Sequence, residues 1–68
     1  MNEEKFNMEL RKYLKKVGVT SQREIEQAVR SAVQSGELTG RETLNAKVTL
    51  EVGGVNLSAK IEGSIALE

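Results

Sequence analysis

The sequence predicts an α+β domain of order α-α-β-β, in which a helical hairpin lies on one face of a two-stranded antiparallel β-hairpin. Apolar residues recur with the helical period of 3.6 as far as Gly36, and with the strand period of 2 in the second half of the chain. The chain has only 68 residues, which suffices for a single domain with a small core.

The first helix is predicted over residues 2–17. Asn2 is expected to be its N-cap, because an asparagine side chain accepts hydrogen bonds from the first free backbone N–H groups. Gly18 is expected to end the helix in a left-handed conformation. The apolar stripe of this helix consists of Phe6, Leu10, Tyr13, Leu14 and Val17.

A second helix is predicted over residues 21–35. Ser21 and Glu24 have the S-x-x-E spacing of a capping box, which is typical of a helix start. Gly36 is expected to end this helix. About three residues separate the two helices, so we expect a tight helical hairpin. The second stripe consists of Ile25, Ala28, Val29, Ala32 and Val33.

Two strands are predicted over residues 43–52 and 55–67, after a polar connector. Apolar and polar side chains alternate along both, which is typical of a hairpin with one apolar face. Gly63 falls at an inward position and indicates a bulge or a close approach of another backbone.

The register of the hairpin has two solutions. A two-residue turn at Gly53 and Gly54 places Lys47 opposite Lys60, whereas a four-residue loop places Lys47 opposite Glu62. The second solution avoids a like-charge pair, but two-residue glycine turns are the commoner connection. We therefore expect the short turn.

Composition argues against catalysis, metal binding and membrane insertion. The formal net charge is zero, and the chain contains neither histidine nor cysteine. A disulfide, a thiolate–metal site and a His or Cys nucleophile are therefore excluded. We expect no cofactor, no metal and no enzymatic activity. No apolar run has the length of a membrane span, and the acidic start does not resemble a secretory signal, so a cytoplasmic location is expected.

Nucleic-acid binding is the alternative function that the sequence suggests. Residues 13–33 have the outline of a helix-turn-helix, although Leu14 lies where that motif needs a small residue, and the domain is neutral overall. A solvated helix face accounts for the same side chains. The candidate anion-binding or nucleic-acid-binding residues are Arg11, Lys12, Lys15, Lys16, Gln22, Arg23, Gln27 and Arg30.

Protein binding is the function that we expect. A two-stranded sheet is marginally stable in water and has two unpaired edges. A homodimer, formed through a strand edge or the apolar face, would both stabilise the sheet and cover unpaired edges. The alternative is a monomer whose helices lie across the hairpin. The candidate interface residues are Val48, Leu50, Leu57 and Ile61.

The segments Phe6–Lys12 and Leu14–Glu26 resemble the signature of a small family of short bacterial proteins of unknown function. The resemblance extends over most of the chain. It implies a stand-alone cytoplasmic bacterial protein and supplies no functional residues. We therefore expect a non-enzymatic interaction module that binds itself and an unidentified protein, with a small helix-turn-helix-like DNA- or RNA-binding protein as the alternative.

Overall fold

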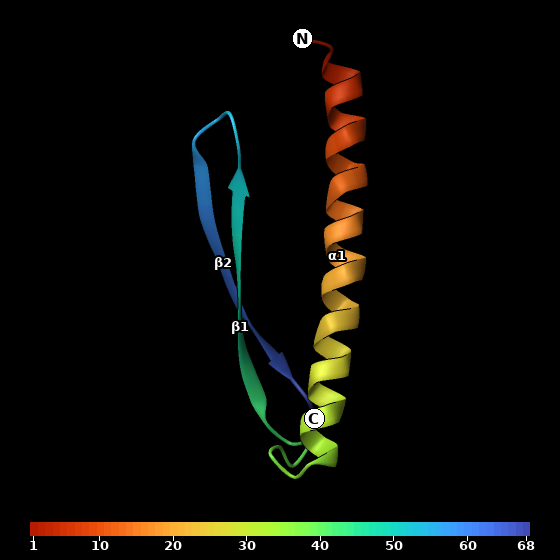
Figure 1. Ribbon diagram of the computed structural model, residues 1–68, viewed down its shortest axis with the longest axis vertical. Helices are drawn as coiled ribbons and strands as arrows, with labels where there is room; N and C mark the ends of the chain where they lie inside the picture. Colours follow the sequence, from red (N-terminus) through yellow and green to blue (C-terminus); the bar gives the residue numbers. More distant parts are fainter. The chain divides into compact units, whose positions relative to one another are not determined.

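The computed structural model describes the whole chain, which forms one helix followed by two strands (Figure 1). Helix α1 spans Glu3–Gln34, strand β1 spans Thr43–Val52 and strand β2 spans Leu57–Ala66. The chain divides into two compact units, Met1–Glu37 with the helix and Leu38–Glu68 with the hairpin. The α+β composition and the β-hairpin are thus confirmed.

Both ends of α1 are closed by the residues that the sequence predicts. The Asn2 side chain accepts a hydrogen bond from the backbone N–H of Lys5 at 3.1 Å. At the other end Gly36 has a φ of +84°, and its N–H donates to the carbonyl of Val33 at 3.2 Å. A left-handed glycine just beyond the last turn satisfies carbonyls that have no partner inside the helix.

The predicted helical hairpin is wrong, and with it the order α-α-β-β. The helix continues without interruption through Gly18 and Ser21, so the order is α-β-β. Gly18 has a helical backbone, because the only glycines with positive φ are Gly36, Gly40 and Gly54.

Continuity through Gly18 follows from the phase of the apolar stripe. Val17, Ser21 and Ile25 succeed one another at intervals of four, so the stripe keeps its direction across the supposed turn. A glycine inside a helix costs about 1 kcal/mol relative to alanine. A break would instead leave up to four N–H and four carbonyl groups without helical partners. With no proline in the chain to force that break, the single helix is favoured.

Ser21 therefore does not act as the N-cap that its S-x-x-E spacing predicts. It lies inside α1 and is half-buried, on the same stripe as Val17. A serine in the stripe interrupts the apolar pattern without interrupting the helix. The end signal at Gly18 and the S-x-x-E spacing at Ser21 are the reasons why the sequence predicts two helices in place of one.

The hairpin has the four-residue loop, and the predicted two-residue turn is wrong. Residues 53–56 connect the strands, and Val52 pairs with Leu57. The loop contains two left-handed residues, Gly54 with φ +87° and Asn56 with φ +52°. Glycine and asparagine are the residues that adopt this region at least cost.

Charge accounts for the choice of register. Lys47 lies opposite Glu62, and Lys60 lies opposite Thr49, so no like charges face each other. Beyond the strands, the Arg41 guanidinium Nε lies 3.8 Å from a Glu68 carboxylate oxygen. The pairing is uninterrupted from Thr43–Ala66 to Val52–Leu57.

Gly63 forms no bulge, contrary to the sequence-based expectation. It pairs in register with Ala46, and a Cβ added there meets nothing within 4 Å. Gly63 is thus a position without a side chain on an otherwise apolar face.

Candidate interaction surfaces

One face of the hairpin carries five apolar cross-strand pairs, which we call the apolar face. Even-numbered residues of β1 face odd-numbered residues of β2, and residues on one side of a strand recur at intervals of two. The pairs are Leu44–Ile65, Ala46–Gly63, Val48–Ile61, Leu50–Ala59 and Val52–Leu57. All four predicted interface residues, Val48, Leu50, Leu57 and Ile61, lie on this face.

The apolar face is open. Ile61 is 60% exposed, and its cross-strand partner Val48 is 44% exposed. Leu50 is half-buried and Leu57 is exposed. No residue of either unit is buried, so neither unit has a hydrophobic core of its own.

The opposite face of the hairpin is polar. It carries the pairs Thr43–Ala66, Asn45–Ser64, Lys47–Glu62, Thr49–Lys60 and Glu51–Ser58. Because most of these side chains are polar or charged, this face can be exposed to solvent at little cost. The hairpin is therefore amphipathic across its two faces.

A second apolar surface runs along α1, which we call the helix stripe. Its members follow one another at intervals of three or four residues, close to the helical period. They are Phe6, Leu10, Leu14, Val17, Ser21, Ile25, Ala28 and Ala32. Phe6 is 49% exposed and Leu10 is 41% exposed.

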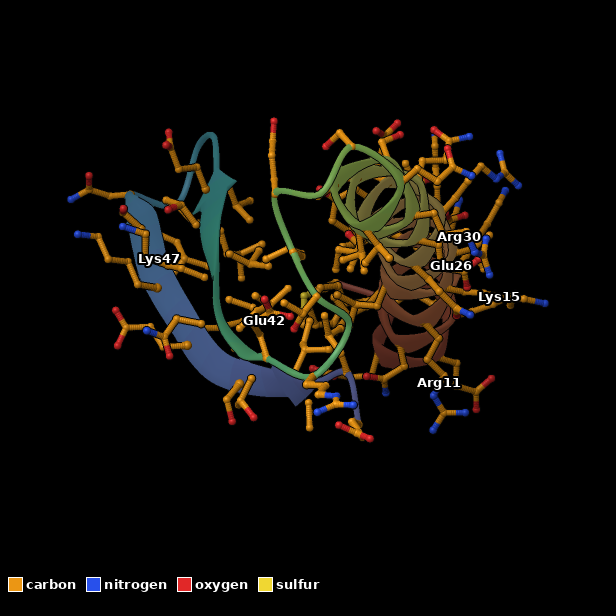
Figure 2. All side chains as sticks on the ribbon, turned by 90° about the horizontal axis from the view of Figure 1, so that it is seen from below. Arg11, Lys15, Glu26, Arg30, Glu42 and Lys47 are labelled. Carbon is orange, nitrogen blue, oxygen red and sulfur yellow. The ribbon has the colours of Figure 1, made fainter.

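The candidate basic residues lie on the same helix, away from the helix stripe. Arg11, Lys15, Glu26 and Arg30 project from one side of α1 (Figure 2). From Leu10 to Arg23 the helix carries five basic residues and no acidic one. We call this segment the basic band; none of its side chains takes part in an ion pair.

The predicted polar residues further along α1 are partly engaged with one acid. Gln22 donates to Glu26 at 2.9 Å, and Arg30 lies 3.3 Å from the same carboxylate. The hydrogen bond from Gln22, followed by the charge of Arg30, lowers the pKa of Glu26. An ionised Glu26 between these side chains opposes a phosphate at this end of the helix.

The continuous helix also removes the helix-turn-helix. That motif needs a turn between two helices, and the residues expected to form it lie inside α1. The structure therefore brings Arg11, Lys15, Arg23 and Arg30 onto one helix. It does not form the recognition motif for which they were predicted.

Sequence reasoning missed a carboxylate that organises the connector. Glu42 accepts hydrogen bonds from three successive backbone N–H groups, those of Thr39 at 2.8 Å, Gly40 at 3.0 Å and Arg41 at 3.1 Å. The hydrogen bond from Thr39 is the largest of the causes that lower the pKa of Glu42 to about 2. Thr39 and Glu42 have the same capping-box spacing as Ser21 and Glu24, and that spacing is the sequence signal that could have located them.

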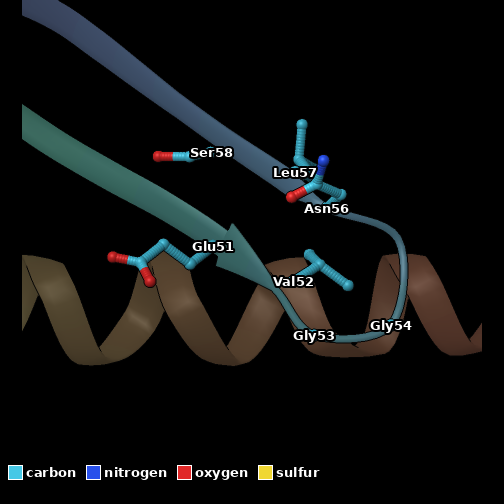
Figure 3. Close-up of a pocket in the computed structure, with 7 residues that line it drawn as sticks. All are labelled: Glu51, Val52, Gly53, Gly54, Asn56, Leu57 and Ser58. Carbon is cyan, nitrogen blue, oxygen red and sulfur yellow. The ribbon is translucent and has the colours of Figure 1, made fainter.

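The hairpin loop encloses a shallow hollow (Figure 3). Glu51 is the only ionisable residue among those that line it, and the others are Val52, Gly53, Gly54, Asn56, Leu57 and Ser58. The hollow has no pair of acid–base groups for proton transfer.

Two further observations concern metals and membranes. No group of three or more His, Cys, Asp or Glu side chains lies in an arrangement able to hold a metal ion. No helix has both the length and the apolar character that spanning a membrane requires.

A model of a family of unknown function (DUF6494) matches residues 1–68. The chain belongs to this family. The resemblance found from the helical segments is thus confirmed, and it extends over the whole length. No curated protein and no solved structure matches the chain. DUF6494 membership assigns no chemistry.

Proposed function

We propose that this member of DUF6494 is a non-enzymatic protein-interaction module with two separate binding surfaces, the apolar face and the helix stripe. The observation that carries the proposal is that the chain aligns apolar side chains on the apolar face and along the helix stripe and yet buries none of them. Burial of apolar surface stabilises a protein by about 25 cal/mol per Å². Without burial, a two-stranded sheet is marginal in water.

The lengths of the two units support a partner from outside the chain. The helix stripe from Phe6 to Ala32 extends about 39 Å at 1.5 Å per residue. The apolar face from Leu44 to Val52 extends about 27 Å at 3.4 Å per residue. The helix stripe is therefore about 12 Å longer than the apolar face, so the two surfaces do not match in length.

The residue inventory supports a role without catalysis. The chain has no histidine and no cysteine, and Tyr13 is exposed on α1. Glu42 and Glu26 owe their lowered pKa values to neighbours on the same segment.

Site-specific photo-crosslinking in cells that express the chain tests this function. A photoreactive amino acid replaces Val48 on the apolar face, and in the matched control it replaces Lys47, the next residue, on the polar face. We expect a defined crosslinked polypeptide from position 48 and little or none from position 47. Absence of any product from position 48, or equal products from both positions, contradicts the proposal.

A second candidate function is anion binding by the basic band, with nucleic acid as one such anion. The observation that favours it is the run of five basic residues without an acid or an ion pair. A titration with mixed-sequence duplex DNA at low salt, followed by amide shifts, tests it. Binding predicts shifts at Arg11–Lys16 that are lost in K15E and kept in K47E; unchanged amides exclude it.

A further inference from the structure

The hairpin has two long strand edges. The sheet has only two strands, so each strand has one unpaired edge. Both strands are ten residues long, with continuous pairing and no proline. Proteins usually blunt an exposed edge with a bulge, a proline or a short strand. These three devices are missing here, and the edge-protecting device that remains is charge, with Lys47 in β1 and Lys60 in β2.

The hydrogen-bond pattern shows which residues offer their backbone at each edge. The N–H of Leu67 donates to the carbonyl of Glu42 at 2.9 Å. In an antiparallel pair, residues that exchange hydrogen bonds alternate with residues that do not. Odd-numbered residues of β2 therefore point their backbone groups at β1. The even-numbered residues Ser58, Lys60, Glu62 and Ser64 point theirs outward.

The free edge of β2 is complementary to itself. In an antiparallel pair of two copies centred on Ile61, Lys60 of each copy lies opposite Glu62 of the other. Ser58 then lies opposite Ser64. On the apolar side Leu57 lies opposite Ile65. Nine residues, Leu57 to Ile65, overlap in this register, and the apolar faces of both copies lie on the same side of one four-stranded sheet.

The edge of β1 offers no equivalent register. Its overlap of the same length, centred on Val48, places Lys47 opposite Thr49 and Asn45 opposite Glu51. A shift to centre on Thr49 pairs Lys47 with Glu51, but the overlap falls to seven residues. Only β2 combines the nine-residue overlap with two opposite-charge pairs, which stabilise a sheet where like charges destabilise it.

We propose that two copies of this chain associate through the free edge of β2, in an antiparallel pair centred on Ile61. The inference rests on the proposed function and names the partner as a second copy. The four outward-facing residues of each copy exchange backbone hydrogen bonds with the other copy. The pairing is isologous, as expected of a twofold dimer. It doubles the width of the apolar face and removes two of the four strand edges.

Single cysteines test the pairing, because the chain has none of its own. Ile61 opposes its own copy at a non-hydrogen-bonded position, where Cα atoms lie about 4.5 Å apart, within the range of a disulfide. I61C should therefore form a covalent dimer under mild oxidation. V48C is the matched control, because Val48 is the cross-strand partner of Ile61 and the centre of the β1 alternative.

Each outcome of that experiment is decisive. A disulfide dimer of I61C with V48C left monomeric supports the β2 edge. Dimers of both variants indicate face-to-face packing and overturn the proposal, and a dimer of V48C alone assigns the β1 edge. A dimer of neither also overturns it. The interaction module survives all of these results if position 48 still crosslinks to another protein, so the two failures are distinguishable.

Charge exchange gives a second test without cysteines. K60E leaves the hairpin intact, because Lys60 faces the neutral Thr49, but it creates two like-charge pairs between copies. We expect its dimer dissociation constant, measured by analytical ultracentrifugation, to rise about tenfold or more. Mixing K60E with the double variant K47E/E62K should restore association, because the double variant keeps an opposite-charge pair between positions 47 and 62 of its own hairpin and supplies the charge that K60E lacks. Dimerisation of K60E at wild-type strength contradicts the register.

Discussion

The carboxylate of Glu42 accepts a hydrogen bond from the backbone N–H of Thr39, with a nitrogen–oxygen distance of 2.8 Å. The hydroxyl of Thr39 in turn accepts from the N–H of Arg41 at 3.3 Å. These contacts resemble a capping box without a helix behind it. These hydrogen bonds hold the connector between α1 and the hairpin in one local turn, and all of their donors and acceptors lie within residues 39–42.

Protonation of Glu42 should loosen the connector. The folded-state pKa of about 2 lies below the ordinary value of 4.5. The stabilisation is therefore complete above about pH 4.5 and is lost as the pH falls towards 2. NMR titration of the side-chain carboxyl should give a midpoint near 2 in the protein. A peptide of residues 39–42 serves as the unfolded control, and an equal midpoint in both would contradict the role of Glu42.

Alanine at Gly18 should stabilise the protein, whereas alanine at Gly36 should destabilise it. Gly18 has a helical backbone with open space where a Cβ would lie, so G18A should raise the free energy of unfolding by about 0.8–1.0 kcal/mol. Gly36 has a φ of +84°, and G36A should cost about 1–2 kcal/mol. Denaturant unfolding followed by circular dichroism measures both. A loss of stability in G18A argues for a turn at Gly18.

The two candidate helix caps should respond differently to alanine. Asn2 accepts a backbone hydrogen bond at the start of α1, so N2A should cost about 1 kcal/mol. Ser21 lies inside the helix, so S21A should be neutral or stabilise by up to about 0.5 kcal/mol. Thermal unfolding of both variants measures the contrast. If S21A costs as much as N2A, Ser21 caps a separate helix.

The register of the hairpin has a direct NMR signature. Lys47 and Glu62 form a non-hydrogen-bonded pair, in which Cα atoms lie about 4.5 Å apart. We expect a strong nuclear Overhauser effect between their Hα protons, and another between those of Asn45 and Ser64. The two-residue turn would replace the first with a contact between Lys47 and Lys60, which should be absent.

Local signals in the sequence predict most of the secondary structure. The strand β1, the N-cap Asn2 and the terminal Gly36 lie where periodicity and capping chemistry place them. The apolar face follows from alternation alone, and all four predicted interface residues lie on it. These features depend on neighbouring residues, which is why a single sequence contains them.

Two features were misjudged because weak local signals compete with one another. Gly18 and Ser21 resemble the end and start of helices, but the phase from Val17 to Ile25 continues through them. At Gly53 and Gly54, the preference for the commonest turn type predicts a two-residue turn. The cross-strand charge of Lys47 and the tolerance of Asn56 for positive φ outweigh that preference.

The candidate basic site shows the limit of reasoning from composition and spacing. Arg11 and Arg30 do lie on one side of the same helix (Figure 2). Their predicted role in nucleic-acid binding requires a turn between two helices, which the structure does not contain. The ion pair between Arg30 and Glu26 is a contact that residue types alone do not specify. The self-complementary edge of β2 likewise cannot be predicted from the sequence, because the register decides which residues of β2 face away from β1.

α1 is one uninterrupted helix, and this continuity produces a single long stripe and removes the helix-turn-helix. Spin labels on M8C/R30C test it by pulsed electron resonance, with the labelled chain diluted in unlabelled protein to suppress distances between copies. A continuous helix separates these positions by about 33 Å at 1.5 Å per residue. A distance near 33 Å is the predicted result. A helical hairpin folded at Gly18 to Ser21 would bring the two residues side by side, at the 8–10 Å spacing of packed helix axes, and so short a distance would contradict the account.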